Sequence, residues 1–218
     1  SELVKPAVVL FLANFFSKDR EGGTPQLFKA AIIICVFVVI IFGQDDFSTA
    51  FFIMVLSLIM FFIAGIKLRW FVSFCLVALP VAFLFIFTEK YRVYRLIAFF
   101  NRDYDLHGLN YQVNMAKKAI ASGGFWGKGI NTSLRSATTI PEIQADFIFA
   151  GWAESMGFFG VLCYFALLIY FALKGYKSAL NCVDKFNGLT CFGLVTCIVY
   201  QSIINCGVVC GALPSTGI

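Results

Sequence analysis

Charged residues and histidine are both scarce in this chain. Only 13% of its 218 residues are Asp, Glu, Lys or Arg, and His107 is the single histidine. This low charge excludes an ordinary soluble domain, in which about a quarter of the residues are charged. No residue near His107 completes a catalytic triad or a ligand set, so we interpret it as a solvated loop residue.

Hydrophobic residues are correspondingly abundant. They make up 60% of the chain, Phe alone occurs 27 times, and the mean hydropathy is +0.86. A helix of about 20 apolar residues crosses a hydrocarbon core of roughly 30 Å and satisfies its own backbone hydrogen bonds. The composition therefore predicts an integral membrane protein built from α-helices, and we expect no nucleic acid among its partners.

Most of the eight cysteines have an apolar setting. Seven of them lie inside apolar runs: Cys35, Cys75, Cys163, Cys191, Cys197, Cys206 and Cys210. Thiols in such runs behave as small hydrophobic groups. Cys206 and Cys210 are spaced to share a helix face, yet no histidine or further cysteine accompanies them to complete a metal site. We predict no resident cofactor, and the sequence leaves a requirement for a divalent cation open.

The apolar runs predict an all-α, polytopic membrane protein with about five full spans and one short N-terminal helix. The short helix covers Ala7 to Phe16. The predicted full spans are Leu27 to Phe42, Phe47 to Ile66, Trp70 to Thr88, Phe147 to Leu173, and Leu189 to Leu213. One long loop, residues 89–145, lies between the third and fourth spans. We expect residues 1–218 to form a single membrane domain.

Basic residues in the short loops predict the orientation. Three loops carry Lys18, Arg20 and Lys29; Lys67 and Arg69; and Lys174, Lys177 and Lys185. The corner at residues 43–46 carries none. Because lysine and arginine in short loops concentrate on the cytoplasmic side, these three loops are predicted to be cytoplasmic. The long loop at residues 89–145 is then extracytoplasmic.

The predicted extracytoplasmic loop is itself basic and rich in glycine. Its basic residues are Lys90, Arg92, Arg95, Arg102, Lys117, Lys118, Lys128 and Arg135. Two glycine turns, at residues 123–124 and 127–129, interrupt it. A positive surface at the outer membrane face suits an anionic ligand such as a phosphate or pyrophosphate head group. The alternative is that these charges only solvate the loop.

Two carboxylates, Glu142 and Asp146, lie where the chain re-enters apolar sequence. Thr139 to Glu142 fits a helix capping box, so one interpretation makes Glu142 only a cap. If the helix continues, both carboxylates share one of its faces, because they are four residues apart.

The predicted face continues through small residues at Ala150, Ala153 and Gly157. Membrane helices pack closely along such strips, so Asp146 is predicted to point into the bundle. An ionisable group in that position is a functional candidate. Glu142 and partial desolvation would both raise the pKa of Asp146 toward a value useful to a general base.

Short motifs recur along the whole chain. Around the loop they are Tyr111-Gln112, Ala119-Ile120, Ser122-Gly123-Gly124, Gly127-Lys128-Gly129, Pro141-Glu142, Asp146 to Ala150, Ala153-Glu154 and Gly157. Elsewhere they are Ser1-Glu2 with Lys5, Gln44, Asp46, Arg95, and Asn205 to Gly211 with Pro214 and Gly217. With these motifs in this order, the chain resembles the SEDS family, which includes RodA, FtsW and SpoVE. The chain departs from the family pattern at Ser48, Ala145 and Ser155. The resemblance implies an internal fragment of a protein with about ten membrane helices.

The resemblance implies a peptidoglycan glycosyltransferase. Such an enzyme polymerises lipid II, a disaccharide-pentapeptide on undecaprenyl pyrophosphate, by inverting transfer at the outer face of the bacterial cytoplasmic membrane. The catalytic carboxylate of the family corresponds to Asp146. The predicted substrate-binding residues are Glu2, Lys5, Arg95, Gln112, Lys117, Gly123, Gly124, Lys128 and Glu142.

The resemblance also implies a class B penicillin-binding protein as partner, within a divisome or elongasome. Division, elongation and sporulation all remain open as the role of the chain. Two other functions fit the same residues. One is a lipid II flippase, in which intramembrane charges line a path. The other is a non-catalytic scaffold that positions the penicillin-binding protein.

Overall fold

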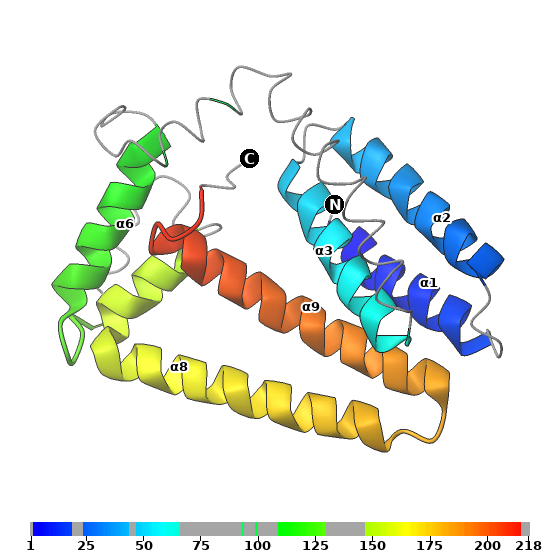
Figure 1. Cartoon of the computed structure of the whole chain (residues 1–218). Helices are drawn as coiled ribbons and strands as arrows, with labels where there is room; N and C mark the ends of the chain where they lie inside the picture. The colour runs from blue at the N-terminus through cyan, green and yellow to red at the C-terminus, as the bar shows by residue number, and fades with distance from the viewer. Residues whose placement is uncertain are drawn as a thin grey trace. The chain divides into compact units, whose positions relative to one another are not determined.

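The computed structural model describes residues 2–18, 24–43, 47–65, 93, 99, 109–129 and 147–214. The secondary structure of these ranges is helical, which confirms the all-α prediction for this part of the chain (Figure 1). Its helices are α1 (Val4–Lys18), α2 (Thr24–Phe42), α3 (Phe47–Ile63), α6 (Leu109–Gly123), α8 (Ile148–Asn181) and α9 (Lys185–Val209). The predicted span Trp70 to Thr88 lies outside the described residues.

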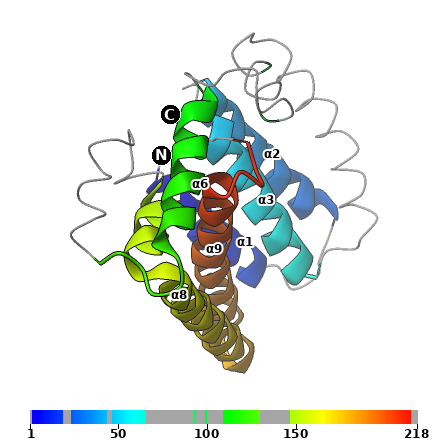
Figure 2. The same cartoon turned by 90° about the vertical axis from the view of Figure 1, so that its left-hand side faces the viewer.

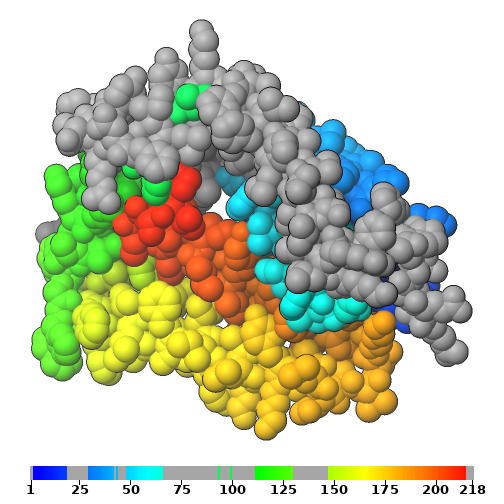
Figure 3. All heavy atoms as spheres, viewed as in Figure 1, coloured from blue at the N-terminus to red at the C-terminus, as the bar shows by residue number. Residues whose placement is uncertain are grey.

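Two of the described helices, α8 and α9, are long and apolar enough to cross a membrane. Along α8 the large apolar side chains are mostly exposed: Leu167, for example, has 69% of its surface exposed, and Leu162 and Leu173 are similarly open. Figure 3 shows the side chains of α8, in yellow and orange, lying open on one face. Apolar exposure on this scale is unusual for a soluble surface and fits a helix that faces lipid.

The predicted loop between the last two spans is mostly helical, so its predicted boundaries are wrong. The helix α8 continues through Lys174 and Lys177 to Asn181, and α9 begins already at Lys185. Lysine is a good helix former, so it marks where the sequence becomes polar rather than where the helix ends. Asp184 caps α9, because its Oδ1 accepts a hydrogen bond from the Phe186 N–H at 3.4 Å.

Two helices end earlier than the apolar runs that predicted them. The helix α3 stops at Ile63 instead of Ile66, and α9 stops at Val209 instead of Leu213. Gly65 has a φ of 88° and Gly211 a φ of 68°, and both follow closely on the last helical residue. Glycine adopts this left-handed conformation without a Cβ penalty and so terminates a helix inside an apolar run.

The predicted long loop at residues 89–145 contains a helix that the pattern of apolar runs does not predict. It is α6, Leu109–Gly123. Val113, Ala116 and Ile120 recur at helical spacing and face the core, while Lys118 is exposed. This spacing is typical of an amphipathic helix, and a search for continuous apolar runs misses it.

The described residues belong to two compact units. The first comprises residues 1–81, 171–199 and 218. In it α1, α2 and α3 pack on one another, and Phe16 meets Phe61 edge to face at 5.4 Å. Gly193 of α9 lies so close to α1 and α3 that a Cβ there would meet Val9 Cγ1 at 2.5 Å and Met60 Sδ at 2.8 Å.

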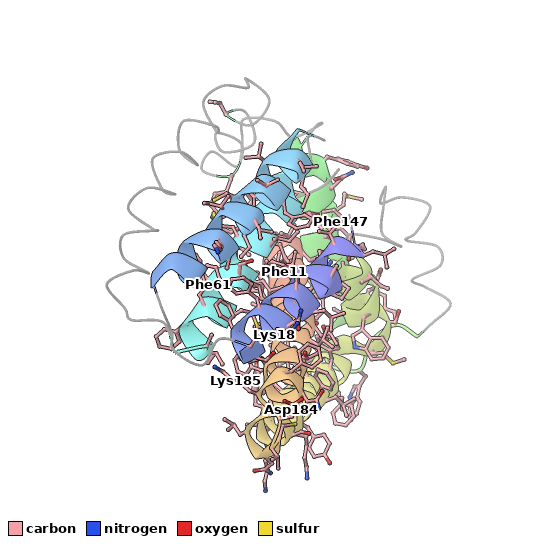
Figure 4. The ribbon with its side chains drawn as sticks, turned by 90° about the vertical axis from the view of Figure 1, so that its right-hand side faces the viewer. Phe11, Lys18, Phe61, Phe147, Asp184 and Lys185 are labelled. Atoms are coloured by element: carbon pink, nitrogen blue, oxygen red, sulfur yellow. The ribbon has the colours of Figure 1, made fainter. Side chains whose placement is uncertain are left out.

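Charged side chains gather at one end of this first unit. Lys18 ends α1, Asp184 lies in the turn before α9, and Lys185 is the first residue of α9; Figure 4 labels all three at the same end. Lys174 and Lys177, in the last part of α8, are exposed close to this turn in sequence.

The second unit comprises residues 82–170 and 200–217. Figure 2 shows α6 beside the first part of α8. Its buried core contains Ala116, Ala119, Phe147, Phe149, Ala150, Cys206 and Val209. Small residues on α6 and α8 let the two backbones approach each other, and the end of α9 closes the core.

Candidate functional site

A tight glycine turn follows α6. We call residues 123–129 the glycine turn. Gly124, Gly127 and Gly129 have φ values of 57°, 79° and 88°. Side chains rarely adopt this left-handed region, so the pattern of glycines in the sequence follows from the path of the backbone.

The helix α8 breaks where it meets the glycine turn. Gly157 has φ 63° and ψ −164°, a combination that is almost restricted to glycine. In an uninterrupted helix, the Phe158 N–H would donate to the Glu154 carbonyl and the Phe159 N–H to the Ser155 carbonyl. The break at Gly157 therefore leaves two donors and two acceptors of the backbone without helical partners.

The glycine turn supplies partners for all four of these groups. Lys128 N–H donates to the Glu154 carbonyl at 3.0 Å and Gly129 N–H to the Ser155 carbonyl at 3.0 Å. In return, the Gly124 carbonyl accepts from Phe158 N–H at 2.9 Å and the Phe125 carbonyl from Phe159 N–H at 3.2 Å. The turn and the helix thus interlock, because a buried backbone group without a partner is costly.

The interlock leaves no room for side chains at its contact points. A Cβ at Gly157 would meet the Phe125 carbonyl oxygen at 2.7 Å, and one at Gly127 would meet the Ser155 carbonyl carbon at 2.6 Å. A Cβ at Gly123 would strike the Ala153 carbonyl oxygen. Gly123 is thus needed for close packing, while Gly124 contributes its carbonyl and its positive φ to the interlock. That these two glycines bind substrate stays a prediction.

A buried carboxylate lies beneath the glycine turn. Glu154 is only 5% exposed, and its Oε1 is 3.6 Å from the ammonium of Lys128. Ser122 Oγ lies 3.1 Å from the same Oε1 and 2.8 Å from the Ala119 carbonyl, but its single proton serves one acceptor at a time. Oε2 is buried and has no hydrogen-bond partner among the described residues. Lys128 is thus the main charge partner of Glu154.

Lys128 combines a fixed position with access to the outside. Its side chain is 43% exposed, whereas that of Glu154 is 6% exposed. The backbone of Lys128 is fixed by its bond to the same residue, Glu154. A cation held in this way could meet an anionic ligand, as the sequence predicted for Lys128.

Glu154 is a candidate that sequence reasoning missed. It matches the family pattern at Ala153-Glu154 but is not among the predicted site residues. A usable signal was present, since it is the only charged residue in the predicted span Phe147 to Leu173. An ionisable group inside such a span is a functional candidate by default.

Two of the predicted substrate-binding residues, Glu2 and Lys5, form an ion pair with each other. Lys5 Nζ is 2.6 Å from Glu2 Oε1 and 4.7 Å from the centre of the Phe52 ring on α3. Lys5 is buried, while the Glu2 side chain is 68% exposed. A buried ammonium above an aromatic face has a cation–π contact in addition to its ion pair.

The remaining described candidates lie on α6. Gln112 is half-buried there. The Lys117 ammonium lies where a Cβ on Gly211 would be, just beyond the end of α9. A positive charge near the carbonyl end of a helix is favourable for that helix, and substrate binding by Lys117 stays a prediction.

Arg95, Glu142 and Asp146 lie outside the described residues, as does the predicted capping box at 139–142. The predicted packing strip is confirmed at Ala150 and Ala153, which are buried against α6. It is wrong at Gly157, where α8 breaks instead of continuing the strip. No group of three or more His, Cys, Asp or Glu side chains that could hold a metal occurs in the described ranges.

Comparison with known proteins assigns the chain to a family. The family described as cell cycle protein, which covers FtsW, RodA and SpoVE, matches residues 1–218. A probable peptidoglycan glycosyltransferase FtsW of Borreliella burgdorferi is 34% identical over 221 residues, covering 100% of this chain and 61% of the relative. Stage V sporulation protein E of Bacillus subtilis is 32% identical over 225 residues, covering 100% of this chain and 60% of the relative.

The fold is also shared with a solved structure. A chain from work on the structural coordination of polymerization and crosslinking by a peptidoglycan synthase complex aligns with a TM-score of 0.73 at 22% identity. The alignment covers 97% of this chain and 59% of that one. The chain spans about three fifths of the length of the curated relatives that it matches. By sequence along its whole length, the chain belongs to the FtsW, RodA and SpoVE family of cell cycle proteins.

Proposed function

We propose that this chain carries the active site of a bacterial peptidoglycan glycosyltransferase that polymerises lipid II. The observation that carries the proposal is the interlock of the glycine turn with α8, which holds the half-exposed Lys128 over the buried Glu154. Relatives along the whole chain are named as probable peptidoglycan glycosyltransferases. A fixed cation at the end of an apolar helix suits a substrate that joins a lipid tail to a pyrophosphate.

The proposed reaction forms one glycosidic bond and breaks one bond to phosphate. A sugar hydroxyl attacks the anomeric carbon of a lipid-linked sugar, and undecaprenyl pyrophosphate leaves with the bonding electron pair. Asp146 accepts the proton of the attacking hydroxyl as general base. In support, Phe147, the residue after Asp146, is buried in the α6, α8 and α9 core, which anchors the chain next to the proposed base.

The negative charge that develops on the leaving pyrophosphate needs cations. Lys128 supplies one in this proposal, and the family resemblance adds Lys5 and Arg95 as separate candidates. Lys128 and Lys5 each have a carboxylate partner, Glu154 and Glu2. These carboxylates fix the direction of the ammonium groups before substrate arrives, so less ordering is needed during the reaction.

The proposal places the glycine turn at the outer face of the cytoplasmic membrane. From Phe158 to Leu173 the chain is apolar and helical over roughly 24 Å, close to the thickness of a hydrocarbon core. Lys174, Lys177 and Lys185 follow at the far end, and basic residues of short loops favour the cytoplasm. The opposite end of α8, with the glycine turn, then faces outward. A class B penicillin-binding protein is the proposed partner for crosslinking.

The test is polymerisation of lipid II by the purified complete protein without other enzymes. The wild-type protein should produce glycan chains, and Asp146→Asn should lose about 10² to 10⁴ in rate, the usual contribution of a general base. Asparagine keeps the size and the capping ability of aspartate, so a purely structural Asp146 would be rescued. Lipid II transport without polymer would instead favour a flippase, and activity of Asp146→Asn near wild type would remove Asp146 as the base.

A further inference from the structure

Four exposed aromatic side chains form a patch where the glycine turn meets α8. We call this patch the aromatic face; it consists of Phe125, Trp126, Phe158 and Phe159. Trp126 is 78% exposed, and the others are between 52% and 57% exposed. The ring centroids of Phe125 and Trp126 are 5.1 Å apart, those of Phe125 and Phe158 5.7 Å, and those of Trp126 and Phe159 6.3 Å.

The backbone holds these rings in place. The hydrogen bonds from Phe158 N–H to the Gly124 carbonyl and from Phe159 N–H to the Phe125 carbonyl set the turn directly against α8. Trp152 Nε1 donates to the Gly160 carbonyl at 3.1 Å, which bridges the break at Gly157. The aromatic face is therefore a preformed surface, although its rings are open to the surroundings.

The position of the aromatic face indicates what covers it. On one side it continues into the exposed apolar surface of α8, at Leu162 and Leu167. On the other side it borders Lys128 and the polar backbone of the glycine turn. Tryptophan and tyrosine concentrate at the level of lipid head groups, where an apolar surface meets a polar one, and Trp126 is the most exposed ring of the aromatic face.

Neither bulk water nor the hydrocarbon centre of the bilayer suits this surface as well as the head-group region does. Four exposed aromatic rings in water would make a large apolar patch. At the hydrocarbon centre, the charge of Lys128 and the non-helical backbone of the turn would lose the polar surroundings that they need. A lysine beside the rings also suits anionic head groups.

We propose that the aromatic face lies in the head-group region of the phospholipid bilayer and holds the glycine turn at a fixed depth. The proposal rests on the membrane placement of α8 given under the proposed function. It adds that the lipid bilayer itself positions Lys128, because the ring cluster and the ammonium are parts of one interlocked unit.

The test measures tryptophan fluorescence of the complete protein in phosphatidylcholine vesicles. Every tryptophan other than Trp126 is replaced by Phe, which in this chain means Trp70→Phe and Trp152→Phe. Quenching is compared for lipids brominated close to the head group, lipids brominated near the chain end, and iodide in the water. We expect the largest loss of Trp126 emission with bromine near the head group, and little with bromine near the chain end or with iodide.

A matched control uses Leu167→Trp in a background that also carries Trp126→Phe. Leu167 is exposed on α8, so this tryptophan should respond most to bromine near the chain end. If the control responds to lipid and Trp126 responds only to iodide, or to no quencher, the aromatic face is in water or under protein and the proposal is overturned. If the control fails to respond to any lipid, the membrane placement of α8 is wrong as well. Polymerisation of lipid II is measured separately, so its failure would overturn the proposed function alone.

Discussion

At the scale of single residues, Glu154 shows how an unfavourable group can be retained. Its carboxylate is buried, one oxygen has no hydrogen-bond partner among the described residues, and the other shares the single proton of Ser122 with a backbone carbonyl. Burying a charge in this way is costly unless a cation compensates. Lys128 is that cation, and it belongs to the glycine turn, which is hydrogen-bonded to α8.

We predict that Glu154→Gln separates the charge of this residue from its shape. Glutamine keeps an acceptor for Ser122 but removes the attraction to Lys128, whose half-exposed side chain limits the stability that the pair contributes to about 1 kcal/mol or less. Thermal unfolding of the complete protein should therefore change little, while the KM for lipid II rises. Ser122→Ala is the matched control, since it removes the hydroxyl and leaves the ion pair. An unchanged KM in Glu154→Gln would separate Glu154 from substrate binding.

Lys5 offers a second test at this scale. Lys5→Met keeps the apolar stem of the side chain but removes the ammonium that lies over the Phe52 ring; because the Glu2 partner is mostly exposed, the protein should still fold normally. Lipid II polymerisation should fall, because a cation for pyrophosphate is lost. Lys18→Met, at the exposed far end of the same helix, is the control and should leave the rate unchanged. Equal rates in both variants would assign Lys5 to structure only.

At the scale of elements, the glycine turn and α8 act as one part. The helix does not simply bend at Gly157, because four of its backbone groups exchange helical partners for partners in the turn. Such an exchange explains why the break carries no unpaired backbone group at Phe158 or Phe159. It also ties residues 123–129 to the position of a long apolar helix.

We predict that Gly157→Ala destabilises the fold more than Gly129→Ala. Both glycines have positive φ, so each substitution carries backbone strain of about 1–3 kcal/mol. Only at Gly157 would the new Cβ also strike backbone, whereas no atom of the described residues lies within 4 Å of a Cβ at Gly129. Apparent unfolding temperatures of the two variants of the complete protein provide the comparison. Equal losses of stability would mean that α8 accommodates a side chain at the break and that the interlock is loose.

At the scale of the whole molecule, the sequence predicted the helical class of the structure better than the ends of its helices or the contacts between its segments. Composition and apolar runs were sufficient to predict helices, because a membrane helix satisfies its backbone hydrogen bonds within its own segment. Helix ends were misplaced where Lys174 and Lys177 continue α8 and where Gly211 ends α9 inside an apolar run. The interlock was unpredictable, since it consists of backbone hydrogen bonds between residues about thirty positions apart. The assignment of Asp146 as base stays a prediction.

Membrane topology is a property of the whole molecule, and α8 allows it to be tested with two positions. Lys118 is exposed on α6, which leads into the glycine turn, and Lys177 is exposed near the opposite end of α8. One apolar helix lies between the turn and Lys177, so the two positions should be on opposite sides of the membrane. In a background without native cysteines, Lys118→Cys should react with a membrane-impermeant maleimide added to intact cells, and Lys177→Cys only after the membrane is opened.

The possible labelling patterns lead to different conclusions about mechanism. Reaction of both variants in intact cells would mean that α8 does not cross the bilayer, and its exposed apolar surface would then need a protein partner. The reversed pattern would place Lys128 and the glycine turn in the cytoplasm. Lipid II would then have to be used before it crosses the membrane, which would exclude polymerisation at the outer face. The expected pattern leaves Lys128 facing the side on which glycan strands grow.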